Sequence, residues 1–330
     1  MRKSWLTTSM VLLVICGCTS PTTDGVLRLE ELTYPEIDAI DREQSIFFLT
    51  FGNLEEHGPH IPVGSDYYMA VAVRDGLIER LKASYPDYDM VVVPVIPLGE
   101  GGANDLARDF EHVGTFALRY ETLRDVTIDM GASIANKGFQ NIFLIHAHGA
   151  PLHSVAFNEA SAFVSERYGV RMVNISSLIF GQGFFSDDVV TQHLGEGWQD
   201  ETGITGHSGI AETSINLYLH DLVDSIYTEL EPFVVADFGE VFRIHERTGF
   251  QGYWSDPSQA SAAIGEDLYN DFVERSFRIA ELTLSGEDLS GLPLYPNVGP
   301  PNPAADAYLS EVLGRYSAQE AEIEAWLREQ

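Results

Sequence analysis

The sequence predicts an α/β protein, a three-layer α/β/α sandwich with a mainly parallel sheet. Two observations lead to this prediction: short apolar runs alternate with longer segments of helical periodicity, and polar, histidine-containing segments follow several of these runs. Continuous apolar runs bounded by turn residues are typical of parallel strands that are covered on both faces. The runs of this kind span residues 45–51, 90–96, 141–145 and 170–175.

Amphipathic helices are expected between these strands. Apolar residues recur at steps of three and four after the first run and again before the third, which places them on one face of a helix. Strands separated by helices of this length form βαβ units, whose strands are parallel. The two apolar stripes consist of Ala70, Val73, Leu77 and Leu81, and of Leu123, Val126, Met130 and Ile134.

Residues 1–18 are not expected to belong to the fold. Two basic residues precede a mostly apolar stretch from residue 6 to residue 15, which is the order of a secretory signal peptide and too short to span a membrane comfortably. Residues 15–18 read Ile-Cys-Gly-Cys and resemble the lipobox of bacterial lipoproteins. We therefore expect an exported protein, anchored to a bacterial membrane by a lipid on Cys18 and facing the periplasm or the cell exterior. A plain signal peptide, cleaved a residue or two later, is the alternative.

The rest of the chain divides into three parts. Residues 19–43 begin with a turn-rich, weakly apolar stretch and are predicted to be a tether. Residues 44–285 hold all the predicted strands and form the folded domain. Residues 286–330 begin with a connector rich in proline and glycine. They end with a glutamate-rich helix, predicted from Ala305 to Arg328, that packs either on its own domain or on a neighbouring subunit.

The charge balance limits the partners. The chain has 19 Lys and Arg residues against 50 Asp and Glu residues, a formal net charge of −31 at pH 7. A surface this acidic repels phosphate backbones, so no nucleic acid is expected as a partner. It also disfavours docking on anionic lipid through charge alone. Attachment to a membrane would therefore depend on the lipid on Cys18.

A polar segment directly after the first strand carries candidate metal ligands. Residues 55–60 read Glu-Glu-His-Gly-Pro-His, and Asp66 follows where the first helix is expected to begin. Glu55 and His57 are two residues apart, so in an extended segment both side chains leave the same face. Mixed carboxylate and imidazole ligands suit Zn²⁺ or Mn²⁺. A polar turn whose aspartate caps the helix is the alternative.

Two further segments lie where an α/β enzyme places its site, beyond the ends of strands. Residues 146–149 read His-Ala-His-Gly after the third strand, and two histidines at a strand end are a stronger signal than one. Residues 206–214 place His207 and Glu212 before a helix predicted from Ile215 to Leu222. For this segment the alternative is an ordinary helix cap, with Glu212 as a first-turn charge favoured by the helix dipole.

Together these segments resemble the creatininase family of amidohydrolases. Residues 55–66 carry the family's Glu-x-His-Gly-Pro-His-x-Pro-x-x-x-Asp signature, and residues 207–214 carry its His-x-Gly-x-x-Glu-Thr-Ser element. Weaker matches lie at residues 111–115 and 249–265. The resemblance covers about residues 44–280 in the family's order, and it implies a creatininase-like fold for the sheet domain.

This resemblance implies two divalent metal ions per subunit, with zinc as the first choice and manganese or iron as the others. Glu55, Asp66 and His148 would hold one ion. His57, Asp66 and Glu212 would hold the other, so that Asp66 bridges the two. A metal-bound hydroxide would then attack an amide carbonyl, because metals lower the pKa of bound water.

The resemblance also implies the proton relay, the substrate class and the assembly. His207 would be the catalytic group that passes a proton to the leaving nitrogen. The substrate would be a small, cyclic or short peptide amide, and the protein a homo-oligomer, a hexamer by the same resemblance. The candidates for side chains that hydrogen bond to ligands are His60, Glu111 and His112. For His60 a structural turn histidine is the alternative.

Two departures from the family pattern argue against creatinine as the substrate. Creatininases supply a metal ligand two residues after the strand-end histidine, where this chain has Ala150, so Glu212 takes that role in the implied set. They also carry a tryptophan four residues before the relay histidine, where this chain has Gly203. Trp198 is the nearest candidate for that tryptophan.

The competing class is a lipid-anchored binding protein that has kept the fold and lost catalysis. A binding protein is free to lose metal ligands and the relay group, so their joint presence favours an enzyme. A metal-storage lipoprotein would need more exposed histidine or cysteine than the chain carries. The residues present are Glu55, His57, Asp66, His148, His207 and Glu212.

Overall fold

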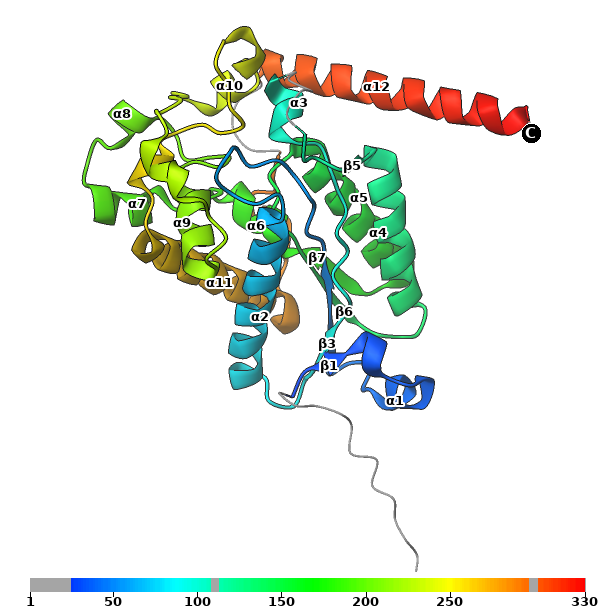
Figure 1. Ribbon diagram of the computed structural model, residues 1–330. Helices are drawn as coiled ribbons and strands as arrows, with labels where there is room; N and C mark the ends of the chain where they lie inside the picture. Colours follow the sequence, from blue (N-terminus) through cyan, green and yellow to red (C-terminus); the bar gives the residue numbers. More distant parts are fainter. Residues whose placement is uncertain (1–24, 108–112, 297–301, 330) are drawn as a thin grey trace, which may run out of the picture.

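A five-stranded parallel sheet forms the centre of the molecule (Figure 1). The computed structural model describes residues 25–107, 113–296 and 302–329. The strand order is β1-β3-β2-β6-β7 and every pairing is parallel, so the carboxyl ends of all strands lie at one edge. The strands are β1 (Leu27–Arg28), β2 (Ser45–Thr50), β3 (Asp89–Val92), β6 (Asn141–Ile145) and β7 (Arg171–Asn174).

The strand sequences suit a sheet that is buried on both faces. All six residues of β2 are buried, and Phe48 lies in register with Val92 of β3 and Phe143 of β6. Aromatic and β-branched side chains favour such packed strand positions. The predicted strands are all present, but β3 ends at Val92. It is shorter than predicted because Pro94 has no N–H to continue the ladder.

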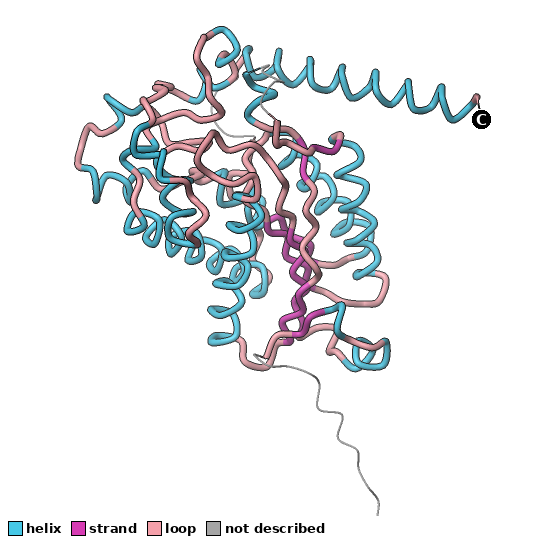
Figure 2. Tube along the Cα trace, in the orientation of Figure 1, coloured by secondary structure: helices cyan, strands magenta, loops and turns pink. Residues whose placement is uncertain are grey.

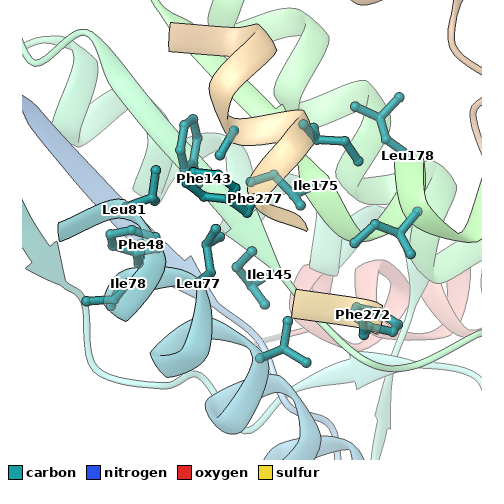
Figure 3. Close-up of a cluster of buried hydrophobic side chains, with 14 of the residues drawn as sticks. Phe48, Leu77, Ile78, Leu81, Phe143, Ile145, Ile175, Leu178, Phe272 and Phe277 are labelled. Atoms are coloured by element: carbon teal, nitrogen blue, oxygen red, sulfur yellow. The ribbon is translucent and has the colours of Figure 1, made fainter. Parts of the chain in front are cut away.

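Helices α2 (Ser65–Ser84), α6 (Ile175–Gly181) and α11 (Ala262–Ser285) cover one face of the sheet. Figure 3 shows side chains of α2 and α11 gathered with Phe48 and Phe143 of the sheet. Burying one such large apolar side chain contributes about 1.5–3 kcal/mol to folding. The apolar stripe predicted for the first helix is entirely buried.

Helices α4 (Tyr120–Ala135) and α5 (Pro151–Tyr168) pack on each other and cover the opposite face. Phe47 and Leu49 point to this side, because neighbours along a strand alternate between faces. Figure 1 shows these two helices and α2 on opposite sides of the sheet. The layers of helix, sheet and helix confirm the predicted α/β/α sandwich.

Shorter elements surround the edge of the sheet at which the polar segments emerge. Figure 1 shows α3 and α10 at this end, beside the start of α12 (Pro303–Arg328), and Figure 2 shows that loops make up much of the region. Loops held by a rigid scaffold commonly carry binding groups. The remaining elements are β4 (Gly99–Glu100), α3 (Ala103–Ala107), β5 (Ala117–Leu118), α7 (Asp187–Leu194), α8 (Gln199–Thr202), α9 (Ile210–Leu219), α10 (Phe238–Val241) and the 3₁₀ turns η2 (Ser225–Glu229), η3 (Ile244–Glu246), η4 (Pro257–Gln259) and η5 (Leu289–Gly291).

Residues 26–40 form regular structure where the sequence predicted a tether. Strand β1 pairs with β3 at the edge of the sheet, and η1 (Leu29–Glu31) and α1 (Tyr34–Ala39) follow it. Thr33 and Glu36 form a capping box that satisfies backbone N–H groups at the start of α1. A strand of two residues gives no periodicity in a sequence, which is why this segment was predicted as part of the tether.

The C-terminal helix α12 packs on its own chain through its first half. The side chain of Asn302 caps the helix, and Tyr308 and Val312 are buried beside α3 and α10. Every residue from 317 to 329 is exposed, and Figure 1 shows this end of the helix projecting from the domain. The predicted helix was two residues shorter at its start.

The predicted signal peptide and the predicted lipid anchor fall outside the described residues. Residues 1–24, which include the predicted signal peptide and Cys18, lie outside the described residues. Within the described ranges, no helix has both the length and the apolar character that a membrane span requires.

Candidate metal centre

The predicted metal ligands and His207 meet at the carboxyl end of the sheet. They come from the segment after β2, the start of α2, the segment after β6 and the start of α9. All of them are buried, the most exposed at 8%. We call this set the acid–histidine cluster, and its members are Glu55, His57, Asp66, His148, His207 and Glu212.

The segment after β2 folds back on itself, and this fold brings Asp66 beside Glu55. Gly58 has a φ of 63°, a left-handed conformation that glycine adopts without strain. The backbone N–H of Glu55 donates to the carbonyl oxygen of Val63 at 3.0 Å, so the start of α2 lies against the segment. Asp66 is the second residue of that helix. The bend that the glycines and prolines predicted therefore returns Asp66 to the site.

Helix α9 places Glu212 in its first turn. The helix begins at Ile210, with Gly209 as its N-cap, so the predicted start at Ile215 is wrong. Ser208 has a φ of 53°, and its backbone N–H donates to Glu212 Oε2 at 2.7 Å. This bond holds the carboxylate at the helix start and turns it toward the sheet segments.

Asp66 lies between two histidines. Its Oδ2 is 3.3 Å from His148 Nδ1, and its Oδ1 is 3.8 Å from His57 Nε2. Glu55 Oε2 is 2.7 Å from His148 Nδ1, and Glu212 Oε2 is 3.5 Å from His57 Nε2. Candidate ligand atoms therefore gather in two triads, each within 4.8 Å, that share Asp66.

His207 stands beside both triads. Its Nδ1 is 3.7 Å from Glu55 Oε1 and 3.9 Å from Glu212 Oε2, and its ring centroid is 4.4 Å from that of His57. Glu55, His57 and His207 also form a triad close enough to hold an ion. Geometry alone thus leaves His207 near any bound cation, either as a ligand or as a neighbour.

The three histidines are oriented as metal-binding histidines usually are. Each donates one ring N–H to a backbone carbonyl and presents its other nitrogen to the carboxylates. Such a bond fixes the tautomer and leaves a lone pair for a metal. The bonds join His57 Nδ1 to Glu55 O at 3.0 Å, His148 Nε2 to Glu100 O at 2.8 Å and His207 Nε2 to Glu56 O at 2.8 Å.

Two buried ligand atoms in the cluster, His57 Nε2 and Asp66 Oδ2, have no hydrogen-bond partner. His57 Nε2 is buried and faces Asp66 and Glu212 at distances longer than a hydrogen bond. Buried polar atoms are nearly always paired in folded proteins, so an unpaired nitrogen that faces two carboxylates needs an explanation. A divalent cation between them would supply the missing partner, and the residues present fit such an ion.

Protons on two histidines of the cluster, His57 and His148, offset part of its negative charge. Burial disfavours the charged form of His57, but Asp66 and Glu212 beside it raise its pKa to about 9. Burial also disfavours the charged form of His148. The carboxylates of Glu55 and Asp66 outweigh this effect and raise the pKa of His148 well above its usual value. Metals bind deprotonated ligands and release their protons, so a cation would replace these protons as the balancing charge.

The other predicted site residues lie outside the cluster. His60 Nε2 is 2.9 Å from Thr213 Oγ1, the hydroxyl next to Glu212 in the chain, and burial lowers the pKa of His60 to about 4. Ala150 lines a cavity that opens on the cluster, and its side chain offers no ligand atom. Glu111 and His112 lie outside the described residues.

The tryptophan near His207 is Trp254 and not Trp198. The indole N–H of Trp198 donates to Thr191 Oγ1 at 3.0 Å, and the residue packs in a core cluster and does not line the cavity. Trp254 lines the cavity, and its ring centroid is 5.6 Å from that of His207. The sequence signal that could have found it is the family-like pattern at residues 249–265, which contains Trp254.

A cavity of about 240 Å³ opens on the acid–histidine cluster. Its polar side chains come almost entirely from the cluster, and most of its other lining residues are apolar or aromatic. Ligand sites are commonly built in this way, with a few polar groups that fix the reacting atoms and an apolar surface that binds the rest.

Comparison with known proteins places the chain in a family. Residues 30–280 match the creatininase (creatinine amidohydrolase) family, and the chain belongs to it. The match begins at residue 30, earlier than residue 44, in agreement with a folded segment that contains α1.

Individual relatives are similar at low identity. The creatinine amidohydrolase of Pseudomonas putida is 27% identical over 244 residues, which cover 72% of this chain and 89% of that protein. The mycofactocin precursor peptide peptidase of Mycolicibacterium smegmatis is 26% identical over 230 residues, covering 67% and 78%. A mutant creatininase described as the Zn-Zn type has a TM-score of 0.60 at 23% identity, over 78% of this chain and 98% of that one.

Proposed function

We propose that this chain is a divalent-metal amidohydrolase that cleaves a C–N amide bond in a small, cyclic or short peptide substrate. The observation that carries the proposal is the pair of buried triads that share Asp66 at the floor of a cavity. The names of two relatives, a creatinine amidohydrolase and a precursor peptide peptidase, both describe cleavage of a C–N bond.

We assign the two triads as the two metal sites. Glu55, Asp66 and His148 would hold one ion, and His57, Asp66 and Glu212 the other, with Asp66 as the bridge. When bound, the cations would lower the pKa of a water molecule and polarise the amide carbonyl. Zinc is the first choice because it accepts mixed nitrogen and oxygen ligands and because one structural neighbour is described as the Zn-Zn type.

We assign the proton relay to Nδ1 of His207. Burial lowers the pKa of His207 to about 3, so the ring is neutral near pH 7. Its Nε2 is committed to the carbonyl oxygen of Glu56, which leaves the lone pair on Nδ1 facing the cluster. A neutral imidazole in this position can accept a proton from the attacking water and donate it to the leaving nitrogen.

The test is a metal analysis followed by an amide screen. Protein stripped with a chelator and reloaded with zinc or manganese is expected to retain two ions per chain. It is then assayed on creatinine, other cyclic amides and dipeptides. Two bound ions without hydrolysis of any amide would favour the competing class, a catalytically inactive binding protein on the same fold.

We also propose that the protein is exported and anchored by a lipid on Cys18. The support is the signal-like order of the first residues and the lipobox-like Ile-Cys-Gly-Cys at residues 15–18. Cys18→Ser is expected to release the protein from the membrane fraction or to block its processing. A normally processed Cys18→Ser protein that stays with the membrane would contradict the lipid anchor.

A further inference from the structure

We propose that the cavity beside the acid–histidine cluster selects amides that carry an uncharged apolar ring. The inference rests on the proposed function for the position of the amide over the cluster. The position of the ring is argued separately, from the wall of the cavity, from its size and from its charge.

The cavity has a polar floor and an aromatic wall. The floor is the acid–histidine cluster, and the wall faces it with rings from distant parts of the chain. Phe184 follows α6, Phe242 follows α10, and Tyr308 belongs to α12. Tyr295 adds a further ring. Its hydroxyl already donates a hydrogen bond to Gly149 O at 2.8 Å, so a ligand does not need to supply an acceptor for it.

The size of the cavity suits a ring with an amide attached. An apolar protein cavity of about 150 Å³ is large enough to bind benzene. The cavity here has about 240 Å³, which leaves room for the amide above the cluster. The indole N–H of Trp254 is a buried donor without a partner in this wall, and most of the rest of the wall is aromatic or aliphatic carbon. A small cyclic amide with polar atoms all round its ring would therefore bury most of them without hydrogen bonds, which is costly.

The charge of the cavity excludes an acidic ring. Among the described residues that line the cavity, none is lysine or arginine. A carboxylate on the ring would be buried in the aromatic wall without a cation, and an unpaired buried charge is strongly unfavourable. The chain as a whole has a formal net charge of −31, which adds to this preference.

Two buried tyrosines of the wall lie in the part of the chain that follows the family match. Tyr308 is 4% exposed, and its ring lies 5.7 Å from that of Phe242. Tyr295 is 5% exposed. Both tyrosines follow residue 280, where the match to the family ends. The wall that would select the ring is therefore not supplied by the matched family segment alone.

Binding of matched amides to the zinc-loaded full chain tests the inference directly. Calorimetric titration would compare 3-phenylpropanamide with propanamide, and N-benzylacetamide with N-methylacetamide, so that the ring is placed on either side of the amide. In at least one pair the ring is expected to tighten binding by about tenfold or more, and a carboxylate on the ring to abolish that gain. Equal affinities within both pairs, or an undiminished gain with the carboxylate, would overturn the proposal.

A pair of variants locates the ring. Ile204 is half-buried and lines the cavity, so Ile204→Trp would fill part of the ring's space. Ile226 lies on η2, is 42% exposed and does not line the cavity, so Ile226→Trp is the matched control. Ile204→Trp is expected to weaken binding of the ring-bearing amide about tenfold without changing that of its small partner. Equal effects of the two variants, or none, would contradict the assigned position; thermal unfolding checks that both are folded.

Hydrolysis of the same amides separates this inference from the proposed function. Ring-selective binding without hydrolysis of any amide leaves the inference standing and removes the proposed function. Hydrolysis that proceeds equally well with and without the ring, together with equal affinities, removes the inference and supports the proposed function.

Discussion

His146 and His148 follow the same strand, both are buried, and yet their rings meet different neighbours. Nδ1 of His148 is 2.7 Å from a carboxylate oxygen of Glu55. The ring of His146 lies 5.0 Å from that of Phe157 and 5.3 Å from that of Phe180, measured between centroids. His153 packs on both histidines. We call the second group the histidine–aromatic cluster, and it consists of His146, His153, Phe157 and Phe180.

The pKa values of His146 and His148 are shifted in opposite directions. Burial lowers the pKa of His146 to about 3, so its ring is a neutral packing group. The same burial acts on His148, but the carboxylates of Glu55 and Asp66 outweigh it and raise its pKa. Burial of a histidine alone therefore does not mark a functional site. A buried histidine becomes a candidate ligand when carboxylates are buried with it.

The largest expected effect comes from the residue that both triads share. Asp66→Ala should lose most of the bound metal and reduce amide hydrolysis to background, because the change removes one ligand from each ion. Metal analysis and activity of the purified variant measure this. Asp87→Ala, at an exposed position, is the matched control and should behave like the wild type. Retention of two ions by Asp66→Ala would rule out the shared site.

The contrast between the two clusters is tested by one substitution made in each. His148→Gln should weaken zinc binding by more than about 100-fold, beyond the usual loss from a partner outside the coordination shell. His146→Gln should change it by less than about tenfold, because His146 faces aromatic rings. Competition with a fluorescent zinc chelator measures both affinities. Equal losses would mean that the two clusters act as one.

A smaller effect, confined to catalysis, is expected for the relay histidine. His207→Ala should keep its metal content and its fold, because His207 belongs to neither assigned site. Hydrolysis should fall by about 10²–10⁴-fold, the usual worth of a positioned acid–base group. Loss of metal from His207→Ala would make this residue a ligand, in line with the triad it forms with Glu55 and His57. Full activity with metal bound would assign the relay elsewhere.

The sequence alone predicted the features that depend on residues close together in the chain. Residues 55–66 predicted a metal segment because two-residue spacing and bend-forming residues act over short distances, and the structure brings Glu55, His57 and Asp66 together. The buried strands were equally visible, since each is a continuous apolar run. The parallel order of these strands placed the later segments at the same edge of the sheet.

The rest of the site depends on contacts between distant segments. Without the family resemblance, the two histidines of residues 146–148 looked equivalent in sequence. The structure separates them, because His146 packs on Phe157 of α5 and Phe180 of α6. Trp254 and Tyr308 reach the cavity from loops and a helix that the sequence could not orient. The start of α9 was misplaced because its N-cap is Gly209, which has no side chain to mark the cap, and the helix begins at Ile210.

Glu100 touches both clusters, and the smallest expected effect concerns its side chain. Its backbone oxygen accepts a hydrogen bond from His148 Nε2 at 2.8 Å, and its N–H donates to His153 Nδ1 at 3.1 Å. Its carboxylate accepts from the hydroxyl of Tyr316, on α12, at 2.7 Å. Burial raises the pKa of Glu100 from 4.5 to about 7, and the hydroxyl of Tyr316 opposes this rise. Tyr316→Phe should therefore raise that pKa further.

The stability of Tyr316→Phe should depend on pH in a defined direction. Because the native carboxyl holds a proton that the unfolded chain releases above about pH 4.5, the free energy of unfolding falls as pH rises through the native pKa. The variant should lose about 1 kcal/mol near pH 6, the worth of one hydrogen bond, and more near pH 8, where its buried carboxylate lacks the donor. Urea unfolding of the zinc-loaded protein measures this, with Tyr34→Phe, at a position 85% exposed, as the control. If the loss in free energy of unfolding shrinks toward pH 8, Tyr316 does not stabilise the charged form of Glu100. The metal content of the variant should stay unchanged at every pH.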